Sequence, residues 1–165
     1  MFELRELLSA EKWNKIKLVL IGGCRNEEDE KRVKDLKDLC KHFSIEDNVE
    51  FRLNVPFEEL CQAMQKASIG LHSMWNEHFG IAVAEMICAG VLPFVHDSGG
   101  VCELVTDPSL KFVTTTDLLH KVIAVMSWKE AICTQRLAVL KTTPALQKAL
   151  RFPSECERLL QSVGL

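Results

Sequence analysis

Residues 17–23 read Lys17-Leu18-Val19-Leu20-Ile21-Gly22-Gly23, a short apolar run that stops at two glycines. An apolar run of this length that ends at a turn is typical of a strand in a parallel sheet covered on both faces. A helix is expected next, because Asn26 can cap it and residues 27–30 place four acids at its positive N-terminus. This part of the chain is therefore predicted to be a strand, a tight turn and a helix.

The same order recurs further along the chain. Further strands are predicted at 49–53, 68–72, 91–95 and 111–113, and helices beyond Pro56, at 79–89 and near 101–105. Gly90 is expected to end the helix at 79–89. Strands that alternate with helices indicate an α/β fold, and right-handed crossovers make it a Rossmann-like doubly wound parallel sheet. Beyond Thr114 the sequence predicts only helices, at about 116–127, 129–141 and 144–162.

Length and composition narrow the class of protein. A chain of 165 residues is expected to form a single domain, 1–165, and its 47% hydrophobic and 26% charged residues are globular averages. A net charge of −3 argues against nucleic acid as a partner. The seven cysteines are widely spaced without a C-x-x-C pair, which disfavours a disulfide framework and a zinc site. No secretory signal or transmembrane segment is predicted, since Glu85 and Pro93 interrupt the most apolar region, 81–95.

Three predicted turns could bind an anion, because ligands of open parallel sheets collect beyond the carboxyl ends of the strands. The turn at 22–25 offers glycines and Arg25, but four acids follow it. The turn at 73–80 is the best phosphate cradle, since Gly80 lets a ligand approach the backbone at a helix start. The turn at 96–100 combines the Ser98 hydroxyl with bare backbone N–H groups. No dinucleotide fingerprint or P-loop is present at any of them.

Two carboxylates flank the start of the helix predicted at 79–89. Glu77 and Glu85 lie eight positions apart, about 12 Å if both follow one helix. That length suits a nucleotide diphosphate sugar. One carboxylate would accept hydrogen bonds from sugar hydroxyls and the other from ribose hydroxyls, while the diphosphate would bind backbone N–H groups at the helix start between them. The alternative is that Glu85 lies on the exposed face of an amphipathic helix.

Residues 77–85 have the form E-x-F-G followed by a second Glu, which resembles the signature of retaining GT-B glycosyltransferases, glycosyltransferase family 4 or "glycosyl transferases group 1". Segments 18–26, 70–81 and 96–100 resemble, within it, the α-1,2-mannosyltransferases that extend the dolichol-linked oligosaccharide of asparagine-linked glycosylation. The resemblance covers about residues 15–105, and the helical region 115–165 is not recognised. It implies the C-terminal, donor-binding half of a GT-B fold.

By this resemblance, Glu77 is the catalytic residue that contacts the transferred mannose, and Glu85 binds the ribose. Phe79 and Gly80 present backbone amides to the sugar and diphosphate. The remaining donor-binding positions are Gly23, Arg25, Val55, His78, Ile81, Ser98, Gly99 and Gly100. The resemblance implies GDP-mannose as donor, a dolichol-linked oligosaccharide as acceptor, no cofactor and no metal, and a location at the cytoplasmic face of the endoplasmic reticulum membrane.

The chain also departs from the family pattern. It begins at a predicted helix, so the first strand of the donor domain, the Arg and Lys after it and the acceptor-binding half are not recognised in it. The function expected is a donor-binding domain without robust catalysis by this chain alone. The alternative function is that of a catalytically silent fragment or degenerate paralogue that acts through protein contacts, such as pairing with another glycosyltransferase. The alternative location for this chain is the cytosol. A third, weaker alternative is a nucleotide-sugar epimerase or binding protein.

Overall fold

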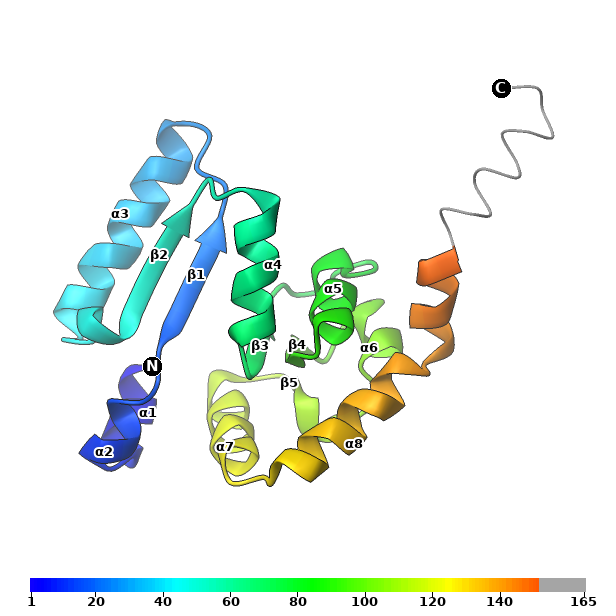
Figure 1. Cartoon of the computed structure of the whole chain (residues 1–165). Coiled ribbons are helices and arrows are strands. Elements are labelled where there is room, and N and C mark those ends of the chain that lie inside the picture. Colours follow the sequence, from blue (N-terminus) through cyan, green and yellow to red (C-terminus); the bar gives the residue numbers. More distant parts are fainter. Residues whose placement is uncertain (152–165) are drawn as a thin grey trace, which may run out of the picture. The chain divides into compact units, whose positions relative to one another are not determined.

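The computed structural model describes residues 1–151 and divides the chain into two compact units, Met1–Ala63 and Met64–Leu165 (Figure 1). These are called unit 1 and unit 2, and each is described by itself. The expectation of one domain over 1–165 stays a prediction.

Unit 1 holds a two-stranded parallel sheet (Figure 1). Its elements are α1 (Phe2–Leu7), α2 (Ala10–Trp13), β1 (Leu18–Gly22), α3 (Glu27–His42), η1 (Glu46–Asn48), β2 (Val49–Leu53) and most of α4 (Phe57–Lys66). β1 and β2 pair from Leu18 opposite Val49 to Gly22 opposite Leu53. The Asn26 side chain caps α3 by accepting a hydrogen bond from the Asp29 N–H, as the sequence predicted.

Unit 2 holds a three-stranded parallel sheet in the order β3-β4-β5. Its elements are β3 (Ile69–His72), α5 (Ile81–Ala89), β4 (Leu92–His96), α6 (Val101–Leu104), η2 (Pro108–Leu110), β5 (Lys111–Phe112), α7 (Thr115–Met126) and α8 (Glu130–Lys141). Residues 144–151 are also helical. The core gathers Val83 and Ile87 of α5, Phe94 and Val95 of β4, and Leu140 of α8, all fully buried. This core forms because the apolar face of α5 packs on β4 and α8 in turn packs on α5.

The structure confirms the α/β class and the parallel strands, and it differs from the sequence expectations in three places. The described strands form two sheets rather than one, because neither β1 nor β3 has a described strand on its second edge. The helix predicted at 79–89 begins at Ile81, because Gly80 has φ +81°, a left-handed conformation outside an α-helix. An amphipathic helix such as α3 is expected to bury its apolar residues, yet Leu36 is 40% exposed and Leu39 50%. Residues 152–162 of the last predicted helix lie outside the described residues.

Candidate functional site

Two loops of unit 2 meet at the carboxyl ends of neighbouring strands. β3 ends at His72 and leads into the loop 73–80, while β4 ends at His96 and leads into the loop 97–100. Because β3 and β4 pair in parallel, both loops leave the same edge of the sheet. The sequence-predicted residues Glu77, Phe79, Gly80 and Gly100 are therefore brought together.

Direct hydrogen bonds lock the two loops to each other. The Gly100 N–H donates to the Glu77 carbonyl oxygen over 2.7 Å, and the Asn76 N–H donates to Ser98 Oγ over 2.8 Å. Ser98 Oγ also lies 2.8 Å from His96 Nδ1, so its hydroxyl already has two protein partners. The expectation of bare N–H groups in this turn is wrong for three residues: the Asp97 N–H donates to the Phe112 carbonyl, the Ser98 N–H to the His96 carbonyl and the Gly100 N–H to the Glu77 carbonyl.

Gly99 is required where the loops touch. Its φ of +70° is left-handed, and a Cβ there would collide with the Glu77 carbonyl oxygen and the Asn76 backbone. A side chain at this position would therefore both strain the backbone and separate the loops. The position of Glu77 depends on a glycine 22 residues further along the chain.

The Glu77 carboxylate is 24% exposed and has neighbours on two sides. Its Oε1 accepts a hydrogen bond from the Phe79 N–H over 3.4 Å, and its Oε2 lies 3.8 Å from His72 Nε2. In the described part of the chain, His72 Nδ1 is buried without a hydrogen-bond partner. The carboxylate is therefore fixed in the loop but reachable from solvent.

The N-terminus of α5 opens beside Glu77. Gly80 is its N-cap residue and provides no side-chain cap, while Val83 and Ala84 N–H both donate to the Gly80 carbonyl. The first N–H groups of a helix lack partners within it, and no acid occupies this first turn. The predicted residues His78, Phe79 and Ile81 are exposed around it, Ile81 at 69%. An anion would find backbone donors and a partial positive charge here.

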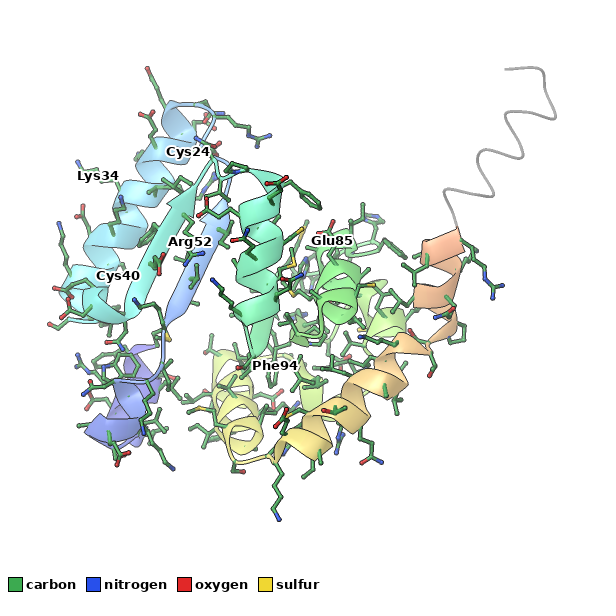
Figure 2. All side chains as sticks on the ribbon, viewed as in Figure 1. Cys24, Lys34, Cys40, Arg52, Glu85 and Phe94 are labelled. Carbon is green, nitrogen blue, oxygen red and sulfur yellow. The ribbon has the colours of Figure 1, made fainter. Side chains whose placement is uncertain are left out.

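Glu85 lies about one turn from that helix start, exposed to solvent (Figure 2). Val83 and Ile87 of the same helix are fully buried, so α5 turns those residues to the core and Glu85 outward. The structure therefore agrees with the alternative in which Glu85 lies on the exposed face of the helix. The 12 Å spacing also no longer follows, because Glu77 precedes the helix instead of lying on it.

The other predicted positions belong to unit 1. Gly23 and Arg25 lie in the turn after β1, and Val55 follows β2. Asn54 joins the ends of these strands, accepting from the Cys24 N–H over 2.8 Å and donating to the Cys24 carbonyl over 2.9 Å. The Arg25 N–H donates to Asp29, which with the neighbouring arginine charges holds the pKa of that carboxyl below its usual value. Arg25 is thereby paired with an acid, although its side chain stays 84% exposed.

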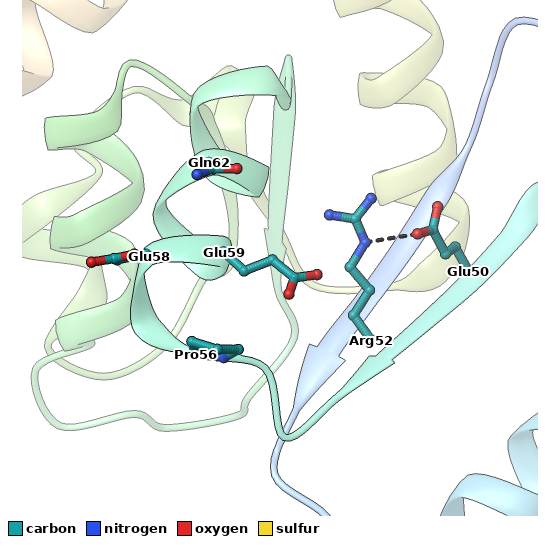
Figure 3. A pocket seen from close by; sticks show the side chains of 6 residues that line it. All are labelled: Glu50, Arg52, Pro56, Glu58, Glu59 and Gln62. Carbon is teal, nitrogen blue, oxygen red and sulfur yellow. Dashed lines mark hydrogen bonds and ion pairs between the residues drawn. The ribbon is translucent and has the colours of Figure 1, made fainter.

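Unit 1 also contains a hollow of about 530 Å³ (Figure 3). It is lined by Glu50, Arg52, Pro56, Glu58, Glu59 and Gln62. Arg52 Nε donates to Glu50 Oε1 over 2.7 Å, so the cation facing this hollow is already paired. None of the sequence-predicted site residues lines it, and its three carboxylates would repel a diphosphate.

A second hollow of about 380 Å³ lies next to the turn after β1. It is lined by Cys24, Val33 and Leu53, by the acids Glu30 and Asp38, and by Lys34, Lys37 and Lys41 of α3; Cys24 and Lys34 are labelled in Figure 2. The sequence pointed to the turn but not to these lysines. Their spacing of three and four positions could have indicated that they share one face of the helix. The described residues contain no group of three or more His, Cys, Asp or Glu that could hold a metal ion.

Residues 2–130 match the family described as "Glycosyl transferases group 1". The chain belongs to this family. A Xenopus laevis member, named "GDP-Man:Man(3)GlcNAc(2)-PP-Dol alpha-1,2-mannosyltransferase", is 55% identical over 97 residues, 59% of this chain and 20% of that protein. The Homo sapiens protein of the same name is 53% identical over 85 residues, 52% of this chain and 17% of that protein. The chain thus spans about a fifth of the length of these relatives.

Solved structures show the same fold at low sequence identity. Anabaena HepE in complex with UDP-glucose matches with a TM-score of 0.66 and 16% identity, over 93% of this chain and 44% of that one. Sucrose-phosphate synthase from Thermosynechococcus elongatus matches with a TM-score of 0.66 and 18% identity, over 88% and 39%. The family resemblance and the fold class predicted from the sequence are confirmed. Within residues 1–151, no helix has both the length and the apolar character needed to span a bilayer.

Proposed function

We propose that this group 1 glycosyltransferase chain is the donor-binding domain of a retaining mannosyltransferase that moves mannose from GDP-mannose to a dolichol-linked oligosaccharide, at the cytoplasmic face of the endoplasmic reticulum. The observation that carries the proposal is that relatives named for this activity are 40–55% identical over more than half of the chain. The locked pair of loops in unit 2 supplies the chemistry that such a domain needs.

The diphosphate is assigned to the N-terminus of α5. The helix start carries a partial positive charge and its N-cap residue, Gly80, has no capping side chain, although the Phe79 N–H already donates to Glu77 Oε1 over 3.4 Å. In a retaining transfer the bond from the anomeric carbon to the diphosphate breaks while the acceptor hydroxyl attacks from the same face. Helix amides stabilise the negative charge that develops on the departing diphosphate, with no metal required.

The sugar is assigned to Glu77 and its neighbours. Its carboxylate can accept hydrogen bonds from mannose hydroxyls, which fixes the anomeric carbon relative to the helix start. His78 and the backbone of the loop 98–100 complete this part, with Ser98, Gly99 and Gly100 acting mainly by holding Glu77 in place.

The ribose is assigned to Glu85 of unit 2. An exposed carboxylate can accept both ribose hydroxyls, and the exposure of Glu85 leaves it available. The donor-binding roles of Gly23, Arg25 and Val55 of unit 1 stay predictions from the family resemblance.

Calorimetry with GDP and GDP-mannose tests the proposal. The wild type is expected to bind both, and Glu85→Ala to bind both at least about tenfold more weakly, since a charge-assisted hydrogen bond contributes about 1.5–3 kcal/mol. Glu130→Ala, which removes an exposed acid at the start of α8, is the matched control and should bind as the wild type does. UDP is the base control. Absence of binding by the wild type, or equal binding by Glu85→Ala, contradicts the assignment.

A second candidate is a catalytically silent relative that acts through protein contacts, including pairing with another glycosyltransferase. Transfer of labelled mannose from GDP-mannose to a dolichol-linked acceptor separates the two candidates. Turnover by the chain alone removes the second, whereas nucleotide binding without turnover favours it.

A further inference from the structure

The proposed function uses Glu77 but not the histidine beside it. His72 is the last residue of β3, opposite Val95 of β4, and its side chain is only 14% exposed. Its Nε2 lies 3.8 Å from Glu77 Oε2. A largely buried imidazole, held on a strand of the sheet, therefore faces the carboxylate that is assigned to the sugar.

The two ring nitrogens of His72 have different surroundings. Within residues 1–151, Nδ1 is buried and has no hydrogen-bond partner, whereas Nε2 faces Glu77. A neutral imidazole carries its proton on one of the two nitrogens. A proton on Nδ1 would be a buried donor without an acceptor, and it would also leave the Nε2 lone pair facing a carboxylate. These surroundings favour a proton on Nε2.

The Glu77 carboxylate thus lies between donors from two different elements. The Phe79 N–H donates to Oε1 from the same loop, and His72 faces Oε2 from β3. A carboxylate has about four acceptor sites on its two oxygens. One donor on each oxygen fixes the rotation of the group and still leaves sites for sugar hydroxyls. The distance of 3.8 Å exceeds that of a hydrogen bond, and contacts of this kind often shorten when a substrate binds.

We propose that His72 is a positioning residue for Glu77: its Nε2–H donates to Glu77 Oε2 and holds the carboxylate in the orientation that accepts mannose hydroxyls. The inference rests on the proposed function, in which Glu77 contacts the sugar. His72 acts on the sugar through Glu77, so it contributes to the affinity for GDP-mannose and not to the affinity for GDP. The ratio of these two affinities, called the mannose gain, is the quantity that His72 controls.

Calorimetry of the full chain with GDP and GDP-mannose tests this role. His72→Phe keeps a ring but removes the Nε2–H, and it should lower the mannose gain about three- to tenfold, the contribution of one hydrogen bond, while GDP binds as before. His72→Gln offers an amide N–H donor and should restore most of the gain. His120→Phe makes the same exchange at an exposed position of α7 and is the matched control.

Urea unfolding separates positioning from a structural role. His72→Phe also removes the buried Nδ1 that has no partner among residues 1–151, so the variant should unfold at no lower urea than the wild type. A destabilised His72→Phe chain with an unchanged mannose gain would show that His72 is structural, and would overturn the inference. Equal mannose gains in His72→Gln and His72→Phe would also overturn it.

Long-range ¹H–¹⁵N correlation NMR of the wild type keeps the test decisive if His72→Phe does not fold. It reports which ring nitrogen carries a proton, and the His72 signals are assigned by their absence from the spectrum of His72→Gln. A His72 ring without a proton on Nε2 overturns the inference. Wild-type chain that binds neither ligand, or GDP alone, overturns the proposed function itself, whereas binding of both with an unchanged gain in His72→Phe overturns only the role of His72.

Discussion

Replacement of Gly99 by alanine tests the locked loops most directly. An alanine at φ +70° has a left-handed conformational cost of about 1–2 kcal/mol. Its Cβ also meets the Glu77 carbonyl oxygen, so the loops must separate and the 2.7 Å hydrogen bond from Gly100 is lost, at about 0.5–1.5 kcal/mol. Gly99→Ala is therefore expected to lower the free energy of unfolding by about 1.5–3.5 kcal/mol.

Gly90→Ala is the matched control. Gly90 has φ +87°, in the same left-handed region, but no atom lies within 4 Å of its added Cβ. This variant carries the conformational cost and the same loss of unfolded-chain freedom, without the collision. The difference between the two variants isolates the contact between the loops.

Urea unfolding followed by far-UV circular dichroism measures both variants, and calorimetry measures their affinity for GDP-mannose. Gly99→Ala should unfold at lower urea than Gly90→Ala and should lose affinity, because Glu77 moves with its loop. Equal unfolding midpoints for the two variants would refute the collision argument. Unchanged affinity in a destabilised Gly99→Ala chain would refute the role given to the loop contact.

Three further predictions concern unit 2. Arg136→Ala should lower the free energy of unfolding by about 1–3 kcal/mol in urea titrations, because Arg136 donates to the largely buried Asp107 and stacks on Trp128 with 4.8 Å between guanidinium carbon and ring centre. Burial alone would raise the pKa of Asp107, but hydrogen bonds from Ser109 and Arg136 outweigh it and lower that pKa. The ionised Asp107 therefore stabilises the fold above the unfolded pKa of about 3.9, and this stabilisation is lost as the pH falls through the folded pKa. Asp107→Asn should accordingly make the free energy of unfolding less dependent on pH in acid titrations. Burial and the Asp97 carboxylate raise the pKa of the Cys102 thiol, which lowers its thiolate fraction. Iodoacetamide should therefore label the exposed Cys88 before Cys102, as measured by peptide mass spectrometry. Faster labelling of Cys102 would contradict this.

The order of elements could be predicted from the sequence because strands such as β1 and β4 are short apolar runs next to a turn, while β2 alternates apolar and charged residues. β2 was predicted residue for residue at 49–53, and the Asn26 cap followed from its place before four acids. The division into two sheets could not be predicted, since strand pairing depends on which edges find neighbours and periodicity does not report that.

The candidate site was predicted in part. The acids and glycines of the 73–80 and 96–100 turns were singled out, and the structure brings these turns together. Two sets of contacts were not predicted: those of Ser98 with Asn76 and His96, and that of His72 with Glu77. They depend on the backbone conformation of the two loops, which the spacing of residues in the sequence does not report. The exposure of Glu85 was one of two alternatives that the sequence left open, because neighbours along a helix face different directions.

The 2.7 Å bond between Gly100 and the Glu77 carbonyl has a consequence for the speed of ligand capture. The loop bearing the carboxylate is ordered by the protein itself during folding, so a nucleotide sugar need not organise it on arrival. Association should then proceed as a single-exponential, diffusion-like step, without the slow isomerisation seen where a lid must first close.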